Sequence, residues 1–323
     1  MTKCIRVHAL GGADVLQWED IPSRSPAPGE IRVRTTAIGV NFIDVYFRTG
    51  LYSQPLPFTA GKEAAGVVEE VGEGVAEFRP GDRVASANLP GAYAAEITAP
   101  AAQFVRVPDG ISDEIAAAIM LKGMTARYLL RRTFRVGPGH TILFHAASGG
   151  VGSIATQWAH HLGATVIGTV GSEEKAELAR KHGCAHTILY RTEDFVARVA
   201  EITGGAKCDV VYDSVGAQTW RGSLDCLKPL GMLVLFGQSS GPVKDFDPAL
   251  LSQKGSLFLT RPTLFHYTAT RETLDETAKD LFDVVLSGAV KIEIGARFPL
   301  KDAAAAHRAL EARQTTGSTV LVP

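Results

Sequence analysis

A glycine-rich turn at residues 145–152 constrains the fold of this chain more than any other feature. The turn follows the apolar run 141–144, which is typical of a short buried strand. After it, apolar residues recur at helical spacing until Gly163, which ends the helix as a left-handed cap. A strand, a glycine turn and a helix in this order expose backbone N–H groups where a pyrophosphate binds well. The spacing Ala-x-Gly-x-x-Gly over 147–152 is the dinucleotide fingerprint with alanine in place of the first glycine.

A second interpretation of the same turn is a nucleophile elbow. Residues 146–150 have the small-x-Ser-x-Gly pattern of a hydrolase strand–turn–helix, which would make Ser148 the nucleophile. Such a hydrolase needs an acid and a histidine after later strands. Asp213 ends a predicted strand, but the histidines after it, His266 and His307, do not follow strands as required. We therefore favour the phosphate-binding interpretation.

Strand-like and helical patterns alternate regularly from about residue 123. The expected strands are 141–145, 165–170, 186–190, 208–213, 231–237 and 255–260. The expected helices lie between them, at 153–162, 173–182, 193–202 and 218–227. Alternation of this kind predicts right-handed crossovers and a parallel, doubly wound sheet. Six strands in one block predict a complete Rossmann domain, so the fold class is α/β.

The residues on either side of this block have a different pattern. Residues 1–122 hold many short β-like runs separated by Pro and Gly turns, which predicts a small barrel or sandwich. The expected elements after Pro262 are a long helix at 271–287, a strand at 291–294, a helix at 302–313 and a strand at 318–322. This tail is too short to form its own domain. We expect a catalytic domain over 1–122, a dinucleotide domain over 123–262, and a segment over 263–323 that completes the first.

The charge balance narrows the class of partner. The chain has 323 residues, 33 Lys and Arg against 34 Asp and Glu, and a net charge of −1. Nucleic-acid and membrane-surface proteins usually carry a basic excess, so neither kind of partner is expected. The four cysteines have no paired spacing, which indicates reduced thiols. No apolar run reaches ~20 residues, and we expect a protein without a signal peptide that is cytoplasmic.

The end of the second expected strand favours NADPH over NADH. NAD-binding domains place Asp or Glu there, to accept from the ribose 2′-OH. This chain instead has Gly171 and Ser172, and Lys175 follows in the first turn of the next helix. A cation is unfavourable there unless an anionic 2′-phosphate lies beside it. Tyr190 and Arg191 follow the third strand and could reach the same phosphate. The alternative is that Lys175 is an ordinary solvated helix residue.

Many ordered blocks resemble the medium-chain dehydrogenase/reductase superfamily, and within it the zinc-free NADPH:quinone oxidoreductases related to ζ-crystallin. The blocks include Gly-Val-Asn-Phe-Ile-Asp at 39–44, Gly-Lys-Glu-Ala-Ala-Gly at 61–66, Leu-Lys-Gly-Met-Thr at 121–125 and the turn at 146–152. The chain looks most like the bacterial quinone oxidoreductases. The resemblance implies a GroES-like β-barrel-type catalytic domain, a Rossmann NADPH domain, and electron transfer from NADPH to a quinone.

The same resemblance implies that no metal takes part. The zinc alcohol dehydrogenases of the superfamily carry a catalytic Cys and His where this chain has Asn41 and Lys62. An amide or an ammonium cannot replace those zinc ligands. Without a Lewis acid, the hydride acceptor must already be electron-poor, as a quinone or an α,β-unsaturated carbonyl is. A local cluster of His and Cys at 182–186 suggests a metal only superficially, because its side chains would diverge where a helix gives way to a strand.

Residue roles follow from the resemblance as well. The implied catalytic set is Asn41 as a donor to the acceptor oxygen, Tyr46 and Tyr52 as pocket walls, and Tyr52 or Lys62 as proton donor. A helix cap remains the alternative for Asn41, core packing for Tyr46, and a surface helix charge for Arg313. The implied cofactor contacts are Asn41, Phe42, Ile43, Asp44, Thr125, Tyr128, Gly150, Val151, Gly171, Ser172, Lys175, Tyr190, Ser214, Phe236, Gly237, Gln238, Ser239, Pro262, Thr263, Leu264 and Arg313.

An apolar edge strand is expected at residues 256–260, the last strand of the Rossmann sheet. An exposed apolar edge invites pairing with a symmetry mate, and related enzymes dimerise in this manner, so we expect a homodimer. Two other functions stay open beside the quinone reductase. One is an NADPH-dependent enone or 2-enoyl reductase, and the other is a non-catalytic, crystallin-like NADPH-binding protein.

Overall fold

The computed structural model describes residues 1–323 as two compact units. The first contains Met1–Met124, Thr270–Leu286 and Ile292–Pro323, and the second contains Thr125–Ala269 and Ser287–Lys291. The chain therefore changes unit at 124/125 and at 269/270, where the expected domain limits were 122/123 and 262/263. Its last part returns to the first unit, apart from the short excursion over 287–291. No helix is both long and apolar enough to cross a membrane.

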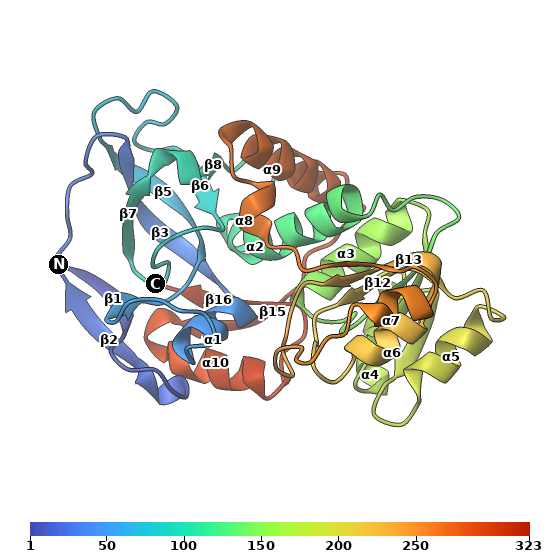
Figure 1. Cartoon of the computed structure of the whole chain (residues 1–323). Helices are drawn as coiled ribbons and strands as arrows, with labels where there is room; N and C mark the ends of the chain where they lie inside the picture. The colour runs from blue at the N-terminus through green and yellow to red at the C-terminus, as the bar shows by residue number, and fades with distance from the viewer. The chain divides into compact units, whose positions relative to one another are not determined.

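The first unit is built mainly of β-structure (Figure 1). Its strands form a three-stranded sheet in the order β2-β1-β4 and a seven-stranded sheet in the order β15-β16-β3-β5-β6-β8, in which β7 also pairs with β3. The strands are β1 Thr2–Val7, β2 Leu16–Ile21, β3 Glu30–Val40, β4 Phe58–Thr59, β5 Glu63–Val71, β6 Arg83–Ser86, β7 Glu96–Pro100, β8 Val105–Arg106, β15 Ile294–Pro299 and β16 Ser318–Val322. The helices are α1 Phe42–Arg48, α9 Arg271–Leu286 and α10 Ala303–Glu311, with α2 Asp113–Tyr128 running across the unit boundary.

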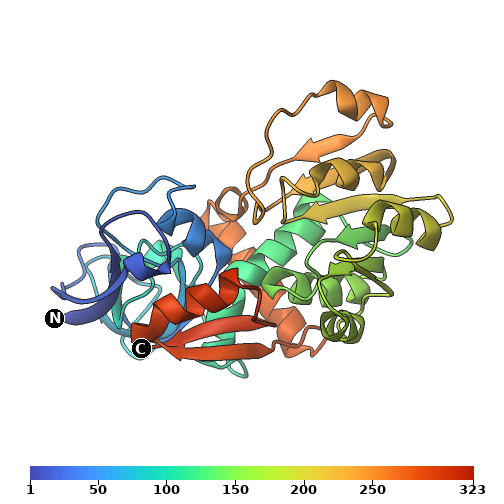
Figure 2. The same cartoon turned by 90° about the horizontal axis from the view of Figure 1, so that it is seen from below.

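The C-terminal segment completes the larger sheet of this unit. Strand β16 pairs antiparallel with β3 and parallel with β15, so residues from the two ends of the chain share one ladder. Helix α10 lies against these last strands (red in Figure 2) and packs its buried Ala303 and Ala306 into the core of the unit. The prediction of a terminal strand at 318–322 is confirmed in its bounds.

The second unit holds six strands in the order β11-β10-β9-β12-β13-β14, with every pair parallel. This is the Rossmann order, with β9 and β12 at the point where the direction of winding reverses. The strands are β9 Thr141–Phe144, β10 Thr165–Val170, β11 His186–Leu189, β12 Cys208–Asp213, β13 Leu227–Leu235 and β14 Phe258–Thr260. The helices are α3 Gly150–His161, α4 Glu173–Lys181, α5 Phe195–Ile202, α6 Trp220–Asp225, α7 Ala249–Gln253 and α8 Leu264–Tyr267, and a π-helical turn at Leu129–Thr133 follows α2.

The predicted alternation of strand and helix is confirmed, and the α/β fold class with it. All six residues of β12 are buried, as expected for a central parallel strand covered on both faces. Gly163 ends α3 with φ +86°, the left-handed conformation that its position predicts. Strand β14 lies at the edge of the sheet, and Phe258 on it is 55% exposed.

Three strand predictions were wrong at their start, and the simplest of them is the strand expected at 255–260, which begins only at Phe258. The strand expected at 291–294 is found at Ile294–Pro299. The backbone N–H and C=O of Lys291 are both hydrogen-bonded to the side-chain amide of Gln157 on α3, so Lys291 cannot join a sheet. Strand β13 begins at Leu227 rather than at 231. The segment 228–230 is exposed and Leu230 has φ +63°, so the first part of this strand has no apolar pattern by which to recognise it.

Candidate functional site

The glycine turn connects β9 to α3 as the sequence predicts. Gly150 and Val151 are the first residues of α3, and Gly149 precedes them as the N-cap. A Cβ at Gly152 would lie 2.3 Å from the carbonyl oxygen of Ala146, so only glycine allows the helix to approach the turn this closely. The backbone N–H groups at the start of α3 and the positive end of its dipole favour an anion at this position.

The residues predicted to hold an adenosine 2′-phosphate come together at the ends of β10 and β11. Ser172 caps α4 and accepts a hydrogen bond from the backbone N–H of Lys175 at 3.4 Å. A Cβ at Gly171 would lie 3.0 Å from the Tyr190 hydroxyl and 3.5 Å from Nε of Arg191. No acidic side chain follows β10 before α4 begins, so the arrangement offers hydroxyls and cations rather than a carboxylate. This chemistry fits a phosphate.

The loops after β12 and β13 form the next part of the same sheet edge. Ser214 follows β12, and its carbonyl oxygen accepts from the N–H of Ser239 at 3.1 Å. A Cβ at Gly237 would lie 2.6 Å from that same oxygen, which keeps the two loops in contact through a glycine. Phe236 packs its ring on Phe144 of β9, with centroids 5.6 Å apart.

The remaining predicted contacts of the second unit lie on its other segments. Thr125 and Tyr128 are buried at the end of α2, and Tyr128 stacks on Tyr267 of α8 with ring centroids 4.5 Å apart. Thr263 caps α8 and Leu264 begins it, directly after Pro262. The second unit thus brings the predicted residues after β12 and β13 into contact, with Phe236 against β9.

The first unit holds the predicted catalytic side chains around α1. Tyr46 on α1 packs on Tyr52 with centroids 5.2 Å apart, and Tyr52 packs on Phe47 at 5.6 Å. The Lys62 ammonium lies 4.5 Å from the centre of the Phe47 ring, a cation–π contact. Burial lowers the pKa of Lys62, and the charge of Asp44 opposes that effect. Tyr46, Tyr52 and Lys62 therefore belong to one aromatic cluster.

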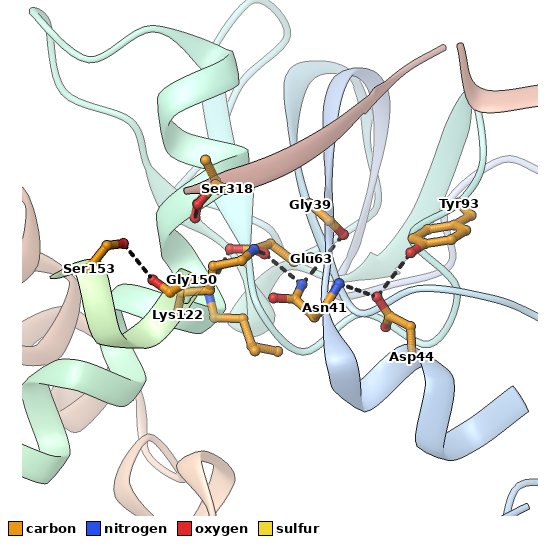
Figure 3. A network of polar contacts seen from close by, with 11 residues as sticks. Gly39, Asn41, Asp44, Glu63, Tyr93, Lys122, Gly150, Ser153 and Ser318 are labelled. Carbon is orange, nitrogen blue, oxygen red and sulfur yellow. Dashed lines mark hydrogen bonds and ion pairs between the residues drawn. The ribbon is translucent and has the colours of Figure 1, made fainter. Parts of the chain in front are cut away.

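Asn41 is buried at the N-terminus of α1, which the helix-cap alternative predicted. Its amide Nδ2 donates to Glu63 Oε2 at 2.7 Å and to the Gly39 carbonyl at 3.4 Å (Figure 3). Its backbone N–H donates to the carboxylate of Asp44 at 2.9 Å. The short hydrogen bond to Glu63 fixes the orientation of the Asn41 amide. The second amide hydrogen makes only the long bond to Gly39, so a ligand can take over that hydrogen easily.

Glu63 was not among the predicted site residues. It is fully buried at the start of β5, and it accepts from Asn41, from the Leu121 backbone N–H at 2.7 Å and from Lys122 Nζ at 3.2 Å. A Cβ at Gly39 would lie 2.1 Å from Glu63 Oε2, which explains the glycine on β3. A glutamate directly before the apolar run 64–68 was the available signal, because a buried carboxylate needs donors around it.

A buried polar chain extends from Asp44 across the first unit. The Tyr93 hydroxyl lies 3.0 Å from Asp44 Oδ2 and 3.0 Å from His307 Nε2, and His307 Nδ1 lies 3.3 Å from Arg48 Nη1. Arg48 also bonds Glu311 at 2.7 Å. Arginine can only donate, so His307 Nδ1 accepts from Arg48 and the ring hydrogen lies on Nε2. His307 Nε2 therefore donates to the Tyr93 hydroxyl, and that hydroxyl donates to Asp44. Sequence reasoning missed Tyr93, Arg48 and His307 here, because they lie far apart in the chain.

The carboxylate at the end of this chain has an unusual acidity. Burial raises the pKa of Asp44 to about 7, although Asn41 and Tyr93 donate to it and Lys122 lies near enough to oppose the shift. Asp44 Oδ1 is buried and has no hydrogen-bond partner. Burial and the positive charge of Arg48 lower the pKa of His307 to about 3, which agrees with a neutral imidazole. A proton on Asp44 must therefore sit on Oδ1, because Oδ2 already accepts two hydrogen bonds.

The hydrolase interpretation of Ser148 is wrong. Asp213 accepts from the backbone N–H groups of Val215 and Gly216 and from the hydroxyls of Thr219 and Ser223, so its donors include no histidine.

Arg313 follows α10 with φ +57° in the first unit, where it lies at the exposed end of that helix. No group of three His, Cys, Asp or Glu side chains is arranged to hold a metal ion.

Comparisons with known proteins agree with this architecture. Residues 27–109 match the alcohol dehydrogenase GroES-like domain, and residues 150–286 match the zinc-binding dehydrogenase family. The chain is 54% identical to a quinone oxidoreductase of Pseudomonas aeruginosa over 100% of both chains, and 51% identical to a 2-haloacrylate reductase of Burkholderia over 98% of both. The crystal structure of Escherichia coli quinone oxidoreductase complexed with NADPH has a TM-score of 0.97 and 49% identity, covering 99% of this chain and 100% of that one.

Proposed function

This chain belongs to the medium-chain dehydrogenase/reductase family, and on that premise we propose that it is an NADPH-dependent quinone oxidoreductase. The observation that carries the proposal is the glycine turn at α3 together with Ser172, Lys175 and Tyr190 at the neighbouring strand ends. The full-length identity to quinone oxidoreductases and the solved NADPH complex of one of them support it.

The phosphates of NADPH divide between two strand ends. Gly150 and Val151 present their N–H groups and the α3 dipole to the pyrophosphate. Gly171, Ser172, Lys175 and Tyr190 hold the 2′-phosphate, with Arg191 beside them. A dianionic phosphate removes the electrostatic disadvantage of Lys175 in the first turn of α4.

The remaining predicted residues are proposed to contact the rest of NADPH. Ser214 and the segment 236–239 lie at the carboxyl ends of β12 and β13, which is where ligands bind in a doubly wound sheet. Thr125 and Tyr128 on α2, the residues 262–264 and Arg313 complete the cofactor set. In the first unit, Phe42, Ile43 and Asp44, which form the first turn of α1, are the proposed cofactor contacts together with Asn41.

The acceptor is a planar, electron-poor molecule beside α1. When bound, NADPH supplies a hydride. Tyr46 and Tyr52 give an aromatic surface on which such a molecule stacks. Lys62 Nζ then stabilises negative charge on the reduced oxygen and gives up a proton more readily than an ordinary lysine, since burial lowers its pKa. Asn41 supplies a second hydrogen by exchanging its long bond to Gly39.

We propose that this chemistry is independent of zinc. The two positions that hold Cys and His in zinc alcohol dehydrogenases are occupied by Asn41 and Lys62. The Asn41 amide is committed as a donor to Glu63, and the Lys62 ammonium lies on the face of Phe47. Neither an amide nor an ammonium is among the thiolate, imidazole and carboxylate groups that hold zinc in proteins.

An enone or 2-enoyl reductase is the second candidate. The specific observation in its favour is the 51% identity to a 2-haloacrylate reductase, whose name describes an α,β-unsaturated carboxylate as substrate. A third possibility, a crystallin-like protein that binds NADPH without turnover, would leave the aromatic cluster and the perturbed Lys62 without a use.

A panel of acceptors separates these functions. NADPH oxidation is followed optically with quinones, enones, enoyl thioesters and 2-haloacrylates, using the wild-type protein and Lys62→Met. The proposal predicts the highest kcat/KM with a quinone and a loss of at least about tenfold in Lys62→Met, the scale of one general acid–base contribution. Faster turnover of an enone or haloacrylate would favour the second candidate. NADPH binding with no turnover of any acceptor would favour the third.

We further propose a homodimer in a reducing, cytoplasmic setting. Strand β14 leaves an unpaired edge with the exposed Phe258, and a two-fold axis there would join two six-stranded sheets. All four cysteines are free and buried, which suits a compartment that keeps thiols reduced.

A further inference from the structure

A buried histidine joins three strand ends beneath the glycine turn. His145 follows β9 and is 1% exposed. Its Nδ1 lies 3.0 Å from Thr169 Oγ1 on β10, and its Nε2 lies 3.0 Å from Ser223 Oγ on α6. Ser223 in turn bonds Asp213 Oδ2 at the end of β12, at 2.8 Å. The imidazole is therefore the central member of a continuous polar chain.

The chemistry of the partners fixes the direction of every hydrogen in this chain. Asp213 is an acceptor, so Ser223 donates its one hydrogen to the carboxylate and must accept from His145 Nε2. The imidazole is then protonated on Nε2, and its Nδ1 accepts from the hydroxyl of Thr169. The Thr169 hydroxyl thus donates to His145, and the Ser223 hydroxyl donates to Asp213, so all the hydrogens of the chain point in the direction of Asp213.

The same partners support the backbone around the phosphate site. Thr169 Oγ1 accepts from the Ala146 N–H at 3.4 Å, and the Thr169 carbonyl accepts from the Ala147 N–H at 3.1 Å. Ala146 has φ +56°, a left-handed conformation that costs free energy in any residue other than glycine and needs support from outside the turn. Asp213 holds the loop after β12 through the N–H groups of Val215 and Gly216.

We propose that His145 is a positioning residue for NADPH: its neutral imidazole ties the glycine turn to β10 and β12, and its protonation in acid loosens the turn and weakens cofactor binding. This inference rests on the proposed binding of NADPH at that turn. His145 itself does not touch the cofactor, since it lies beneath the turn and both its nitrogens are engaged within the protein.

The surroundings of His145 give the sign of the pH effect. Burial lowers its pKa, and the negative charge of Asp213 opposes that shift. The other groups that face the ring are the hydroxyls of Thr169 and Ser223 and the edge-on ring of Phe195 on α5, with centroids 5.0 Å apart. A proton on Nδ1 turns this atom into a donor, so Thr169 must accept from it in competition with the Ala146 N–H. Binding is thus fully supported at neutral pH, and this support is lost only as the pH falls through the lowered pKa of His145, below the ordinary histidine value.

Substitutions that mimic one nitrogen at a time test the proposal. Asn places an acceptor where Nδ1 lies, Gln places a donor where Nε2 lies, and neither titrates. The Kd for NADPH is measured by isothermal titration for wild type, His145→Ala, His145→Asn and His145→Gln at about pH 7.5 and at successively lower pH, down to the acid limit at which the proteins stay folded. His161→Ala, an exposed histidine on α3, is the matched control. Circular dichroism and thermal unfolding verify that each variant is folded.

At neutral pH we expect His145→Ala to raise the Kd about tenfold, the scale of one buried hydrogen bond, and His145→Asn to recover most of this through Thr169. On acidification the Kd of wild type and of the control should rise further than that of His145→Asn, in which nothing titrates beneath the turn. Equal Kd values for folded His145→Ala and wild type, or the same acid response in wild type and His145→Asn, would overturn the inference. Failure of the wild type to bind NADPH at neutral pH would instead reject the proposed function itself.

Discussion

At the scale of single residues, Asp44 shows how position determines chemistry. Its carboxylate caps α1, accepts from Tyr93, and keeps one buried oxygen without a partner. Behind Asp44 lies a chain of hydrogen-bond donors that runs from Arg48 through His307 to Tyr93. Because the Arg48 guanidinium does not lose its proton, this chain cannot carry protons from Glu311 to Asp44. Arg48, His307 and Tyr93 instead act as fixed donors that favour the ionised form of Asp44 against the effect of burial.

Replacing Asp44 by Asn tests this balance through stability. The pKa of Asp44 is about 7 in the folded protein and 3.8 in the reference state, so the unfolded chain releases this proton first. Stability conferred at this site is therefore highest below about pH 4, declines as the pH rises to about 7, and is constant above that. Asn keeps an acceptor for Tyr93 and does not titrate. We expect the free energy of unfolding in urea to fall less between pH 4 and pH 7 in Asp44→Asn than in wild type, and parallel curves would contradict the assignment.

We propose that Lys175 distinguishes the two nicotinamide cofactors. Lys175→Glu should raise the KM for NADPH about 10- to 100-fold, because it replaces a charged partner of the 2′-phosphate with a repelling one, and should leave the KM for NADH nearly unchanged. Glu at this position also completes a capping box with Ser172, so α4 itself gains rather than loses stability. Lys181→Glu, in the last turn of the same helix, is the matched control. Equal effects of Lys175→Glu on both cofactors would remove Lys175 from the phosphate site.

Residues near each other along a motif were predictable, and residues joined only by folding were not. Ser172 and Lys175 share a helix start, and Tyr190 follows the neighbouring strand, so the parallel-sheet rule already brings them together. Glu63, Tyr93 and His307 come from three distant segments of the first unit, and no local pattern links them. The antiparallel register of β3 with β5 places Glu63 opposite Gly39, and the sequence alone does not determine that register.

At the scale of elements, the turn between β9 and α3 depends on one close approach. Gly152→Ala would place a methyl group 2.3 Å from the Ala146 carbonyl, and the helix would have to move away from the turn. We expect NADPH binding by this variant to weaken at least about tenfold. Gly149→Ala is the graded control, since its methyl group would meet the same oxygen at 3.1 Å with φ −77° at that residue. Isothermal titration should find a much smaller change for Gly149→Ala, and equal losses in the two variants would contradict this account of the turn.

Element boundaries show where the sequence pattern was insufficient. The six Rossmann strands were predictable because each is a short apolar run between turns, and their bounds agree closely for β10 and β12. The last strand pair was harder. Residues 291–294 alternate in polarity as a strand does, yet Gln157 of α3 holds Lys291 by both backbone groups and shifts the strand to Ile294–Pro299. The start of this strand is thus set by a side chain that lies 134 residues away in the sequence.

At the scale of the whole molecule, the edge of the Rossmann sheet predicts assembly. Phe258→Lys places a charge on β14, which should disfavour pairing between two copies and shift a dimer toward the monomer in sedimentation velocity. Leu286→Lys, at an exposed leucine on α9 of the other unit, is the control and should leave the dimer intact. A wild-type protein that sediments as a monomer, or a Phe258→Lys variant that still dimerises as well as the control, would reject this edge as the interface.

The central claim is hydride transfer from NADPH to a quinone without a metal. The most direct measurement is kcat/KM for NADPH oxidation with a simple benzoquinone, before and after exhaustive treatment with a chelator, and with NADH in parallel. We predict turnover that chelation does not change and a clear preference for NADPH, because we propose that Asn41 and Lys62 leave no zinc site and that Ser172 and Lys175 at the start of α4 hold the 2′-phosphate. Loss of activity on chelation that added Zn²⁺ restores, or the absence of quinone-dependent NADPH oxidation, would contradict the account.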